Sequence, residues 1–299
     1  MAKFSTVLIG GGTGFVGSHL AEGFRNVASK VLVISRMPGV GRISWNDLQQ
    51  KGLPEETEVI VNVAGQNVLD PMRRWTPGFR QNVVSSRVLT TKTLAEAIEK
   101  SAKPPKVFIT MSGVGYYPPN ETAEYNEESK PAASDFFSKL CHDWENSGNL
   151  SDQTPTRRVI IRSGVVLGSE GGIIQRVYIP FFLGLGGPIG SGNQFFPWIH
   201  IDDLVNMFLF AASNEKVVGV LNGVAPQVVT NKEFSKALGS AMFRPSFMPL
   251  PEKVIELAFG KERASMMTEG QKVVPKRVLD YGFNYKFPDI ESACKNIVN

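Results

Sequence analysis

The chain has 299 residues, of which 42% are hydrophobic and 20% are charged. Its 29 glycines and 19 prolines make up about 16% of the chain, below the roughly 25–30% that marks low-complexity disorder. The net charge of +4 comes from scattered basic residues without an aromatic-interleaved stripe, so we expect no nucleic-acid partner. Two cysteines far apart, Cys141 and Cys294, exclude a disulfide scaffold and form no metal or redox motif.

No apolar stretch is long enough to predict a membrane span. The most apolar segment, Tyr178–Leu185, is interrupted by Pro180 and Gly184 and is shorter than the ~18 residues a span needs. A strand-like run, Thr6–Ile9, begins almost at the first residue and leaves no room for a cleaved leader. Together with free cysteines, which fit a reducing compartment, this predicts a soluble, cytoplasmic protein without a membrane partner.

Short β-branched runs alternate with helix-like segments through the first two thirds of the chain. Near-continuous apolar strands separated by helices are typical of a parallel sheet covered on both faces. We therefore predict an α/β fold with a doubly wound parallel (Rossmann) sheet, whose ligands bind beyond the carboxyl ends of the strands. The predicted strands are Thr6–Ile9, Val31–Ser35, Val59–Val63, Val107–Met111 and Val159–Arg162, and helices between them include Phe15–Phe24, Leu89–Ile98 and Phe136–Leu150.

The pattern changes at about Ser163. A glycine-rich stretch, Gly164–Gly192, is followed by an apolar helix that ends near Ala212, and then by shorter helices. We expect residues 1–163 to form the dinucleotide-binding domain, with later segments adding strands to its sheet. Residues 164–299 are expected to form a smaller substrate or lid lobe with a C-terminal helical segment.

A glycine cluster directly follows the first predicted strand. Gly11, Gly14 and Gly17 give the spacing G-x-x-G-x-x-G at a strand-to-helix turn. Glycines there permit a tight turn, close backbone approach to a pyrophosphate and close helix packing, and the helix N-terminus attracts the phosphates. The alternative is a glycine-rich turn without a ligand. We predict a dinucleotide site contacted by Gly11, Thr13, Gly14, Phe15 and Val16.

The end of the second predicted strand indicates which cofactor is bound. An NAD site has an acidic residue there to accept a hydrogen bond from the ribose 2′-hydroxyl. Here the strand ends in Ser35 and Arg36, Arg42 follows, and no acid occurs between Lys30 and Ile43. A hydroxyl and a guanidinium suit a 2′-phosphate. We predict NADP(H) as the cofactor; the alternative is that Arg36 is only a solvated surface charge.

Three segments at strand ends resemble the extended short-chain dehydrogenase/reductases of the nucleotide-sugar epimerase type. Asn62-Val63-Ala64-Gly65 resembles the family's N-x-A-G, which implies Val63 and Ala64 beside the adenine and ribose. Thr110–Tyr117 resembles the fifth-strand end that holds the family's active-site serine, here Ser112. Arg162–Gly168 resembles the turn near the nicotinamide, which implies a contact from Val165.

Further segments narrow the resemblance to one atypical branch. It is the "epimerase family protein" branch, short-chain dehydrogenase/reductase family 39U with its bacterial YfcH-like, cell-division-inhibitor-like relatives. The resemblance covers essentially the whole chain, including a C-terminal segment of unknown function, and in this branch Asn82 and Arg87 look like cofactor neighbours. The alternative for Arg87 is a salt bridge on the helix surface. The segments are Arg162–Gly172, Phe196–Leu204, Gly270–Pro275 and Gly282–Pro288.

The chain departs from the family at its catalytic motif, Tyr-x-x-x-Lys. Lys139 matches the lysine, but Asp135 stands where the tyrosine is expected. A carboxylate with a pKa near 4 is a poor proton donor at neutral pH. Either Tyr117 or Tyr116 replaces the missing group, or Asp135 acts with a raised pKa; alternatively, the tyrosines pack and Asp135 caps the helix. Our candidate catalytic residues are Ser112, Tyr117 and Lys139.

His200 and Asp202 form an H-x-D pair, but no third ligand has metal spacing, so we predict no metal. We expect His200 to tether its strand and Asp202 or Asp203 to start the following helix. The sequence favours an NADP(H)-dependent oxidoreductase or epimerase-like enzyme acting on a small polar or sugar-like substrate. A non-catalytic NADP(H)-binding sensor or regulatory protein is the alternative, and the oligomeric state is left open.

Overall fold

The computed structural model of this protein describes residues 3–37 and 39–298. In it, seven parallel strands form the central sheet, in the order β11-β7-β5-β4-β1-β2-β3. The chain starts in the middle with β1, moves outward to β3 and then crosses to β4 on the other side. The topological switch point therefore lies between β1 and β4, where such folds bind their ligands. The strands are β1 (Phe4–Gly10), β2 (Ala28–Ile34), β3 (Arg42–Ile43), β4 (Thr57–Asn62), β5 (Val107–Gly113), β7 (Arg157–Ser163) and β11 (Gly219–Gly223).

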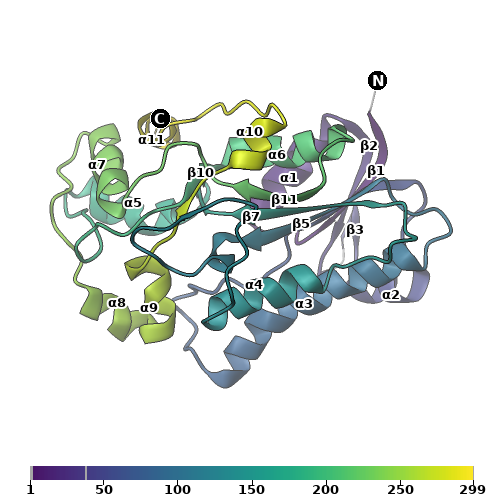
Figure 1. Ribbon diagram of the computed structural model, residues 1–299, viewed down its shortest axis with the longest axis horizontal. Helices are drawn as coiled ribbons and strands as arrows, with labels where there is room; N and C mark the ends of the chain where they lie inside the picture. Colours follow the sequence, from purple (N-terminus) through teal and green to yellow (C-terminus); the bar gives the residue numbers. More distant parts are fainter. Residues whose placement is uncertain (1–2, 38, 299) are drawn as a thin grey trace.

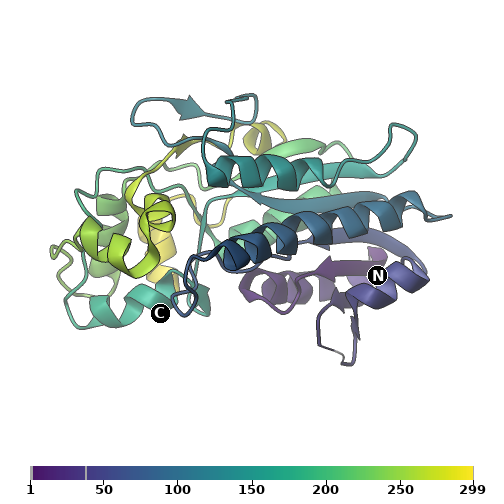
Figure 2. The same cartoon turned by 90° about the horizontal axis from the view of Figure 1, so that it is seen from below.

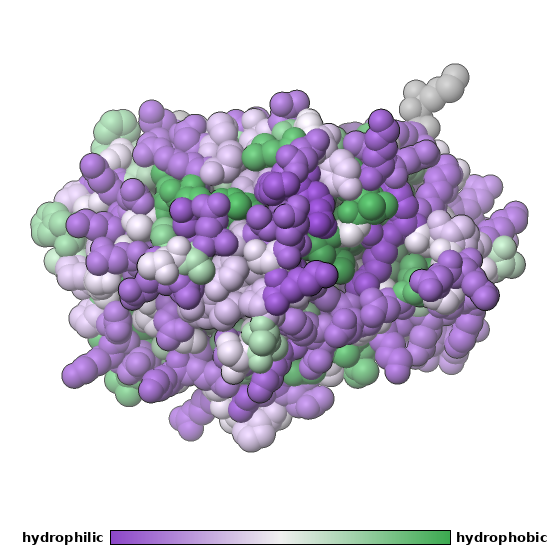
Figure 3. Space-filling model, in the orientation of Figure 1, coloured by the Kyte–Doolittle hydropathy of each residue, from purple (hydrophilic) through white to green (hydrophobic). Residues whose placement is uncertain are grey.

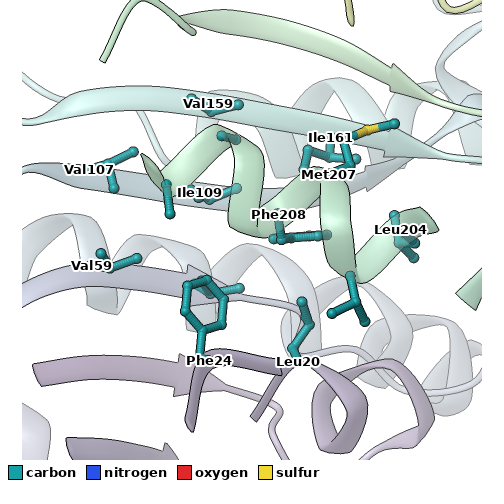
Figure 4. Close-up of a cluster of buried hydrophobic side chains, with 14 of the residues drawn as sticks. Leu20, Phe24, Val59, Val107, Ile109, Val159, Ile161, Leu204, Met207 and Phe208 are labelled. Atoms are coloured by element: carbon teal, nitrogen blue, oxygen red, sulfur yellow. The ribbon is translucent and has the colours of Figure 1, made fainter. Parts of the chain in front are cut away.

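Helices cover both faces of this sheet because alternate strand residues point to opposite sides. In β1, Val7 and Ile9 join the buried cluster of α1 and α6, whereas Leu8 joins the cluster of α2 and α3 (Figures 1 and 4). This arrangement confirms the predicted doubly wound fold. The helices are α1 (Phe15–Arg25) and α6 (Ile201–Ser213) on one face, and α2 (Trp45–Lys51), α3 (Pro77–Glu99) and α4 (Phe136–Asn146) on the other.

The largest difference from the prediction is the start of α3. The helix begins at Pro77, twelve residues before the predicted Leu89. Thr76 caps it by accepting a hydrogen bond from Phe79 N, and Pro77 suits the first helical position because its fixed φ is already helical. Polar residues separate the two buried apolar side chains of this early part, Phe79 and Val83, so its helical pattern is weak in the sequence.

The segments after β7 build a second lobe with its own core beyond the carboxyl ends of the strands (Figures 1 and 2). Phe196, Trp198 and Phe234 lie at its centre. However, α6 and β11, and later α10, pack with the Rossmann core, so after β7 the chain returns to that part twice. The remaining elements are β8 (Val165–Gly168), β9 (Gly171–Gly172), α5 (Ile174–Phe182), β10 (Trp198–His200), α7 (Asn231–Ala241), α8 (Glu252–Phe259), α9 (Lys261–Thr268), α10 (Lys276–Asp280) and α11 (Ile290–Val298), with η1 (Val114–Tyr116) and the pair β6 (Glu124–Tyr125) and β12 (Lys272–Val273).

Hydrophilic residues cover most of the face in Figure 3, and hydrophobic residues appear there in separate small groups. Over residues 3–37 and 39–298, the structure contains no helix both long enough and apolar enough to cross a membrane.

Candidate functional site

The glycine turn between β1 and α1 is shaped by contacts that exclude side chains. Gly11 has φ +80°, and a Cβ there would lie 2.6 Å from Ala64 N. A Cβ at Gly17 would lie 2.1 Å from the carbonyl oxygen of Gly11. Because these neighbours are backbone atoms, they cannot move aside as a flexible side chain could. The turn therefore lies directly against the end of β4, at the topological switch point.

The N-terminus of α1 is open to a ligand. Its cap residue is Gly14, no side chain among the described residues caps it, and its first turn contains no acidic residue. Thr13 and Gly14 are exposed, while Phe15 and Val16 are partly buried. Unpaired N–H groups at a helix N-terminus and its dipole favour an anion such as a phosphate.

The second glycine-rich segment packs against the same turn through Phe15. A Cβ at Gly171 would lie 2.4 Å from Phe15 Cγ, and one at Gly168 would lie 2.8 Å from Phe15 Cζ. Val165 begins β8 in this segment and pairs with Trp198 of β10. The two glycine-rich segments of the sequence are therefore neighbours in the fold, and Phe15 fills the space between them.

The end of β2 presents two arginines beside the turn. Ser35 is buried, its Oγ accepts a hydrogen bond from Met37 N (3.1 Å), and its N–H donates to Ile43 O (2.9 Å). Arg36 directly follows and is exposed, as is Arg42 at the start of β3. Ser35 and Arg36 thus place a fixed hydroxyl and an exposed guanidinium side by side at the end of β2, near Gly12, where an added Cβ would touch Val33.

Asn62 fixes the end of β4 against the glycine turn. Its buried side chain accepts a hydrogen bond from Ala64 N (3.1 Å) and donates to Thr91 Oγ1 on α3 (2.8 Å). In addition, Val63 N donates to Gly10 O (2.9 Å). The motif that contains Asn62 is visible in the sequence, but its bridging role is not. That role appears only when the side chain is seen between the strand and the helix.

Arg87 on α3 points to the chain just after β4. It donates hydrogen bonds to the carbonyls of Gln66 (2.9 Å) and Val83 (3.1 Å), and its Cζ would lie 3.0 Å from a Cβ at Gly65. Burial lowers the pKa of Arg87 to about 10, so it remains cationic at neutral pH. Among the described residues Arg87 forms no ion pair, so the alternative of a salt bridge on the helix surface is not observed. Asn82, five residues earlier, is exposed on the same helix.

Ser112 lies at the carboxyl end of β5 and is buried. Its Oγ has no hydrogen-bond partner of normal geometry within the part of the chain that the structure describes, although it lies near enough to the buried Cys141 thiol to act as a weak donor that lowers the pKa of that thiol, against the larger effect of burial. A buried hydroxyl without a partner costs free energy unless a ligand or water satisfies it. Ser112 is therefore an unsatisfied polar group at the edge where the fold binds ligands.

Asp135, which stands at the sequence position of the family's tyrosine, is the N-cap of α4. Its carboxylate accepts hydrogen bonds from Phe137 N (2.7 Å) and Ser138 N (2.9 Å), as the structural alternative predicted. Lys139 lies one turn later and is exposed. Across the described chain, no hydrogen bond joins Lys139, Ser112 and Tyr117 to one another.

Tyr117 is bound in a buried polar network. Its hydroxyl oxygen lies 2.9 Å from both Asn222 Oδ1 and the carbonyl of Asn126, and it accepts a hydrogen bond from Arg162 Nη1 (2.9 Å). Burial raises the pKa of Tyr117, against the effect of Arg162. This environment favours the packing role over proton transfer. Arg162 in turn donates two hydrogen bonds of 2.8 Å to Glu145 on α4, a pairing that sequence reasoning missed.

The H-x-D pair has a structural role, as expected. His200 Nδ1 accepts a hydrogen bond from Asp202 N (3.1 Å) and so caps α6. Asp202 forms an ion pair with Lys286, and buried Asp203 accepts from the N–H groups of Lys286 (2.7 Å) and Phe287 (2.9 Å). Among the residues described, no three His, Cys, Asp or Glu side chains are grouped so as to hold a metal ion.

Residues 7–222, which contain the glycine turn, Arg87, Ser112 and the α4 segment, match the NAD dependent epimerase/dehydratase family. The chain belongs to this family. Residues 250–297 match a domain of unknown function, DUF1731. Both matches agree with the branch predicted from the sequence, including its C-terminal segment.

Relatives of this epimerase/dehydratase member cover nearly its whole length. An epimerase family protein SDR39U1 from Bos taurus is 50% identical over 98% of this chain and 99% of its own. The crystal structure of human epimerase family protein SDR39U1 (isoform 2) with NADPH has 48% identity and a TM-score of 0.95, covering 98% of this chain and 99% of the human one. A UDP-N-acetylglucosamine 4-epimerase from Bacillus cereus shares the fold, at 17% identity and a TM-score of 0.76 over 98% of each chain.

Proposed function

We propose that this protein binds NADP(H) at the glycine turn and is an oxidoreductase or epimerase-like enzyme for a small polar or sugar-like substrate. The observation that carries the proposal is the open N-terminus of α1. It is bordered by glycine positions at which any side chain would clash with neighbouring backbone, including the end of β4. The human relative solved with NADPH supports the same cofactor.

Two groups of residues at the carboxyl ends of the strands would hold the phosphates of the cofactor. Backbone groups from Gly11 to Val16 would bind the pyrophosphate, since that helix start has free N–H groups and no acidic residue in its first turn. Ser35 and Arg36 would bind the 2′-phosphate. The other predicted neighbours would line the adenine, ribose and nicotinamide; they are Val63, Ala64, Asn82, Arg87 and Val165.

The catalytic part of the proposal depends on Ser112. NADP(H), when bound, supplies or accepts a hydride. Ser112 Oγ is buried, and its nearest polar neighbour is the weakly accepting Cys141 thiol, so it is able to donate a hydrogen bond to a substrate oxygen at the end of β5. Lys139 would contact the ribose from α4. Tyr117 is the weaker candidate for proton transfer because its hydroxyl is already bound by Arg162 and Asn222.

A second function, a non-catalytic NADP(H)-binding sensor or regulatory protein, is favoured by one observation. The position of the family's catalytic tyrosine is occupied by Asp135, whose carboxylate is used as a helix cap. Its two backbone hydrogen bonds commit this carboxylate to the start of α4 and not to a substrate.

One experiment tests both parts. NADPH and NADH are titrated against wild type, Arg36→Ala and the control Arg25→Ala, an exposed arginine at the end of α1. Loss of a charge-assisted phosphate contact should weaken NADPH binding about 10- to 100-fold in Arg36→Ala and leave NADH unchanged. Equal binding of NADH and NADPH by wild type, or an unaffected Arg36→Ala, would contradict the cofactor assignment.

The same NADPH complex is then mixed with a panel of carbonyl compounds and keto-sugars while its absorbance is followed. Oxidation of bound NADPH by a member of the panel supports the enzyme. No oxidation with any compound, combined with nucleotide-dependent capture of a partner protein, supports the sensor.

A further inference from the structure

Large apolar side chains are exposed together on the C-terminal lobe, from two chain segments. One is the second half of α5 with the turn after it, and the other connects α7 to α8. We define the apolar face as the surface of Ile179, Phe182, Leu183, Leu185, Phe243 and Phe247, all of them exposed. Single exposed apolar residues are ordinary, but a continuous group of this kind marks a binding surface.

The two segments are joined by direct contacts. Arg244 Nε donates a hydrogen bond to the carbonyl of Phe182 (2.8 Å), and Arg244 Cζ lies 5.3 Å from the centre of the Phe182 ring. Farther along, Met248 N donates to Gly186 O (3.2 Å), and a Cβ at Gly184 would lie 3.4 Å from Pro245 Cγ. Residues 182–186 therefore lie beside residues 244–248, and the apolar face is continuous across both.

The backbone holds these side chains outward. Phe243 is 90% exposed and has φ +55°, a left-handed conformation that costs a bulky residue free energy. α5 buries Ile174 and Phe181 in the lobe core, and its exposed side carries Ile179 together with Gln175 and Arg176. An aromatic side chain kept exposed in a strained backbone conformation suggests a use for its exposure.

Within the two chain segments that form the apolar face, the charged side chains have one sign; just beyond them stands exposed Glu252, whose carboxylate lies close to Gly190. Residues 171–199 and 240–251 contain two side chains charged at neutral pH, Arg176 and Arg244, and no carboxylate. Both arginines are exposed. In a symmetric dimer through this face the surface would meet itself, so arginines would face arginines without carboxylates from these segments. The charge pattern instead complements an anionic partner.

We propose that the apolar face docks on an anionic lipid surface. Phe243 and Phe247 insert at the boundary of headgroups and acyl chains, and Arg176 and Arg244 contact the lipid phosphates. Such a face lies in the interface and needs no spanning helix, so the proposal departs from the sequence-based expectation of no membrane partner. It does not depend on the proposed catalytic function.

The test is co-sedimentation of the full-length protein with vesicles of phosphatidylcholine, alone or with about one third phosphatidylserine. Wild type should pellet with the anionic vesicles, and more salt should weaken that binding. Phe243→Ser/Phe247→Ser should lower the partition coefficient about 100-fold, tenfold for each ring. Arg176→Gln should lower binding to the anionic vesicles several-fold and leave binding to the neutral ones unchanged.

The matched control is Leu89→Ser/Leu279→Ser, which removes two exposed leucines outside the apolar face and should bind as wild type does. Thermal unfolding of each variant checks that it is folded. Three results would overturn the proposal. They are no pelleting with either vesicle, pelleting unaffected by loss of both phenylalanines, and a wild-type dimer in light scattering that dissociates in the phenylalanine variant without any vesicle binding.

Discussion

Arg162 lies at the end of β7 between charged and aromatic groups. Its guanidinium forms two hydrogen bonds to Glu145 and one to Tyr117, and its Cζ lies 3.2 Å from the centre of the Tyr116 ring. Buried ion pairs contribute little net stability but are costly to break, so they fix geometry more than they stabilise. Here the pair holds α4 and η1 against the strand end next to Ser112. The sequence shows Arg162 at a strand end, but only tertiary packing brings Glu145 to it.

His200 provides a test of pH dependence at the residue scale. Burial lowers the pKa of His200 from 6.5 to about 4, so the folded protein holds the ring neutral while the unfolded chain is protonated below pH 6.5. The folded state therefore binds fewer protons in this range. The free energy of unfolding should not depend on His200 above about pH 6.5, and should fall by up to about 3 kcal/mol as the pH drops from 6.5 to 4.

Urea unfolding of wild type and His200→Asn at a series of pH values measures this effect. Asparagine can still cap α6 by accepting from Asp202 N, although it loses the ring contact with Phe287. We expect the stability difference between the two proteins to be constant above pH 6.5 and to shift in favour of the variant below it. A difference that stays constant down to pH 4 would show that His200 is not held neutral by the fold.

The glycine turn is the element whose role the sequence predicts most completely, and its glycines can be tested separately. At Gly14, φ is −84° and an added Cβ has only an ordinary contact, 3.5 Å from Gly11 O. Gly14→Ala should therefore change stability by less than about 1 kcal/mol, but it should weaken NADPH binding about tenfold or more if the pyrophosphate approaches the backbone there. Gly17→Ala forces a Cβ against Gly11 O and should cost about 3 kcal/mol of stability.

Thermal unfolding and NADPH titration of the two variants separate packing from binding. If Gly14→Ala binds NADPH as wild type does, the phosphate does not lie over Gly14. If Gly17→Ala is as stable as wild type, the close packing of α1 on the turn is not required.

Elements with strong local patterns are those the sequence predicts. The strands of the central sheet are continuous apolar runs, and all five predicted ones lie in it within a few residues of their expected bounds. The first half of α3 has no such pattern, and the helix begins directly after its capping residue, Thr76. The candidate site also has parts that local sequence predicts and parts that it does not. The turn from Gly11 to Gly17 is local in the chain, whereas the contacts of Tyr117 with Arg162 and Asn222 depend on residues 45 and 105 positions away.

At the scale of the whole molecule, the C-terminal lobe is attached to the Rossmann part by α9. Arg263 is buried and donates hydrogen bonds to the carbonyls of Phe259 (2.7 Å), Val68 (3.3 Å) and Asp70 (3.2 Å). Two of these carbonyls belong to the connection from β4 to α3, which leaves the predicted cofactor edge at Val63. The lobe therefore helps to order a segment that borders the site, a contact between residues almost 200 positions apart that no local pattern reveals.

Arg263→Met should loosen this connection. Methionine keeps much of the side-chain volume but leaves buried carbonyls without donors, so we expect a loss of about 3 kcal/mol of stability and faster amide hydrogen exchange in residues 66–76. The control is Lys261→Met, an exposed residue at the start of the same helix, which should cost less than about 1 kcal/mol and leave exchange in residues 66–76 unchanged. If exchange in residues 66–76 is unchanged in Arg263→Met, the connection is ordered without the lobe, and closure of the site edge does not depend on the C-terminal segment.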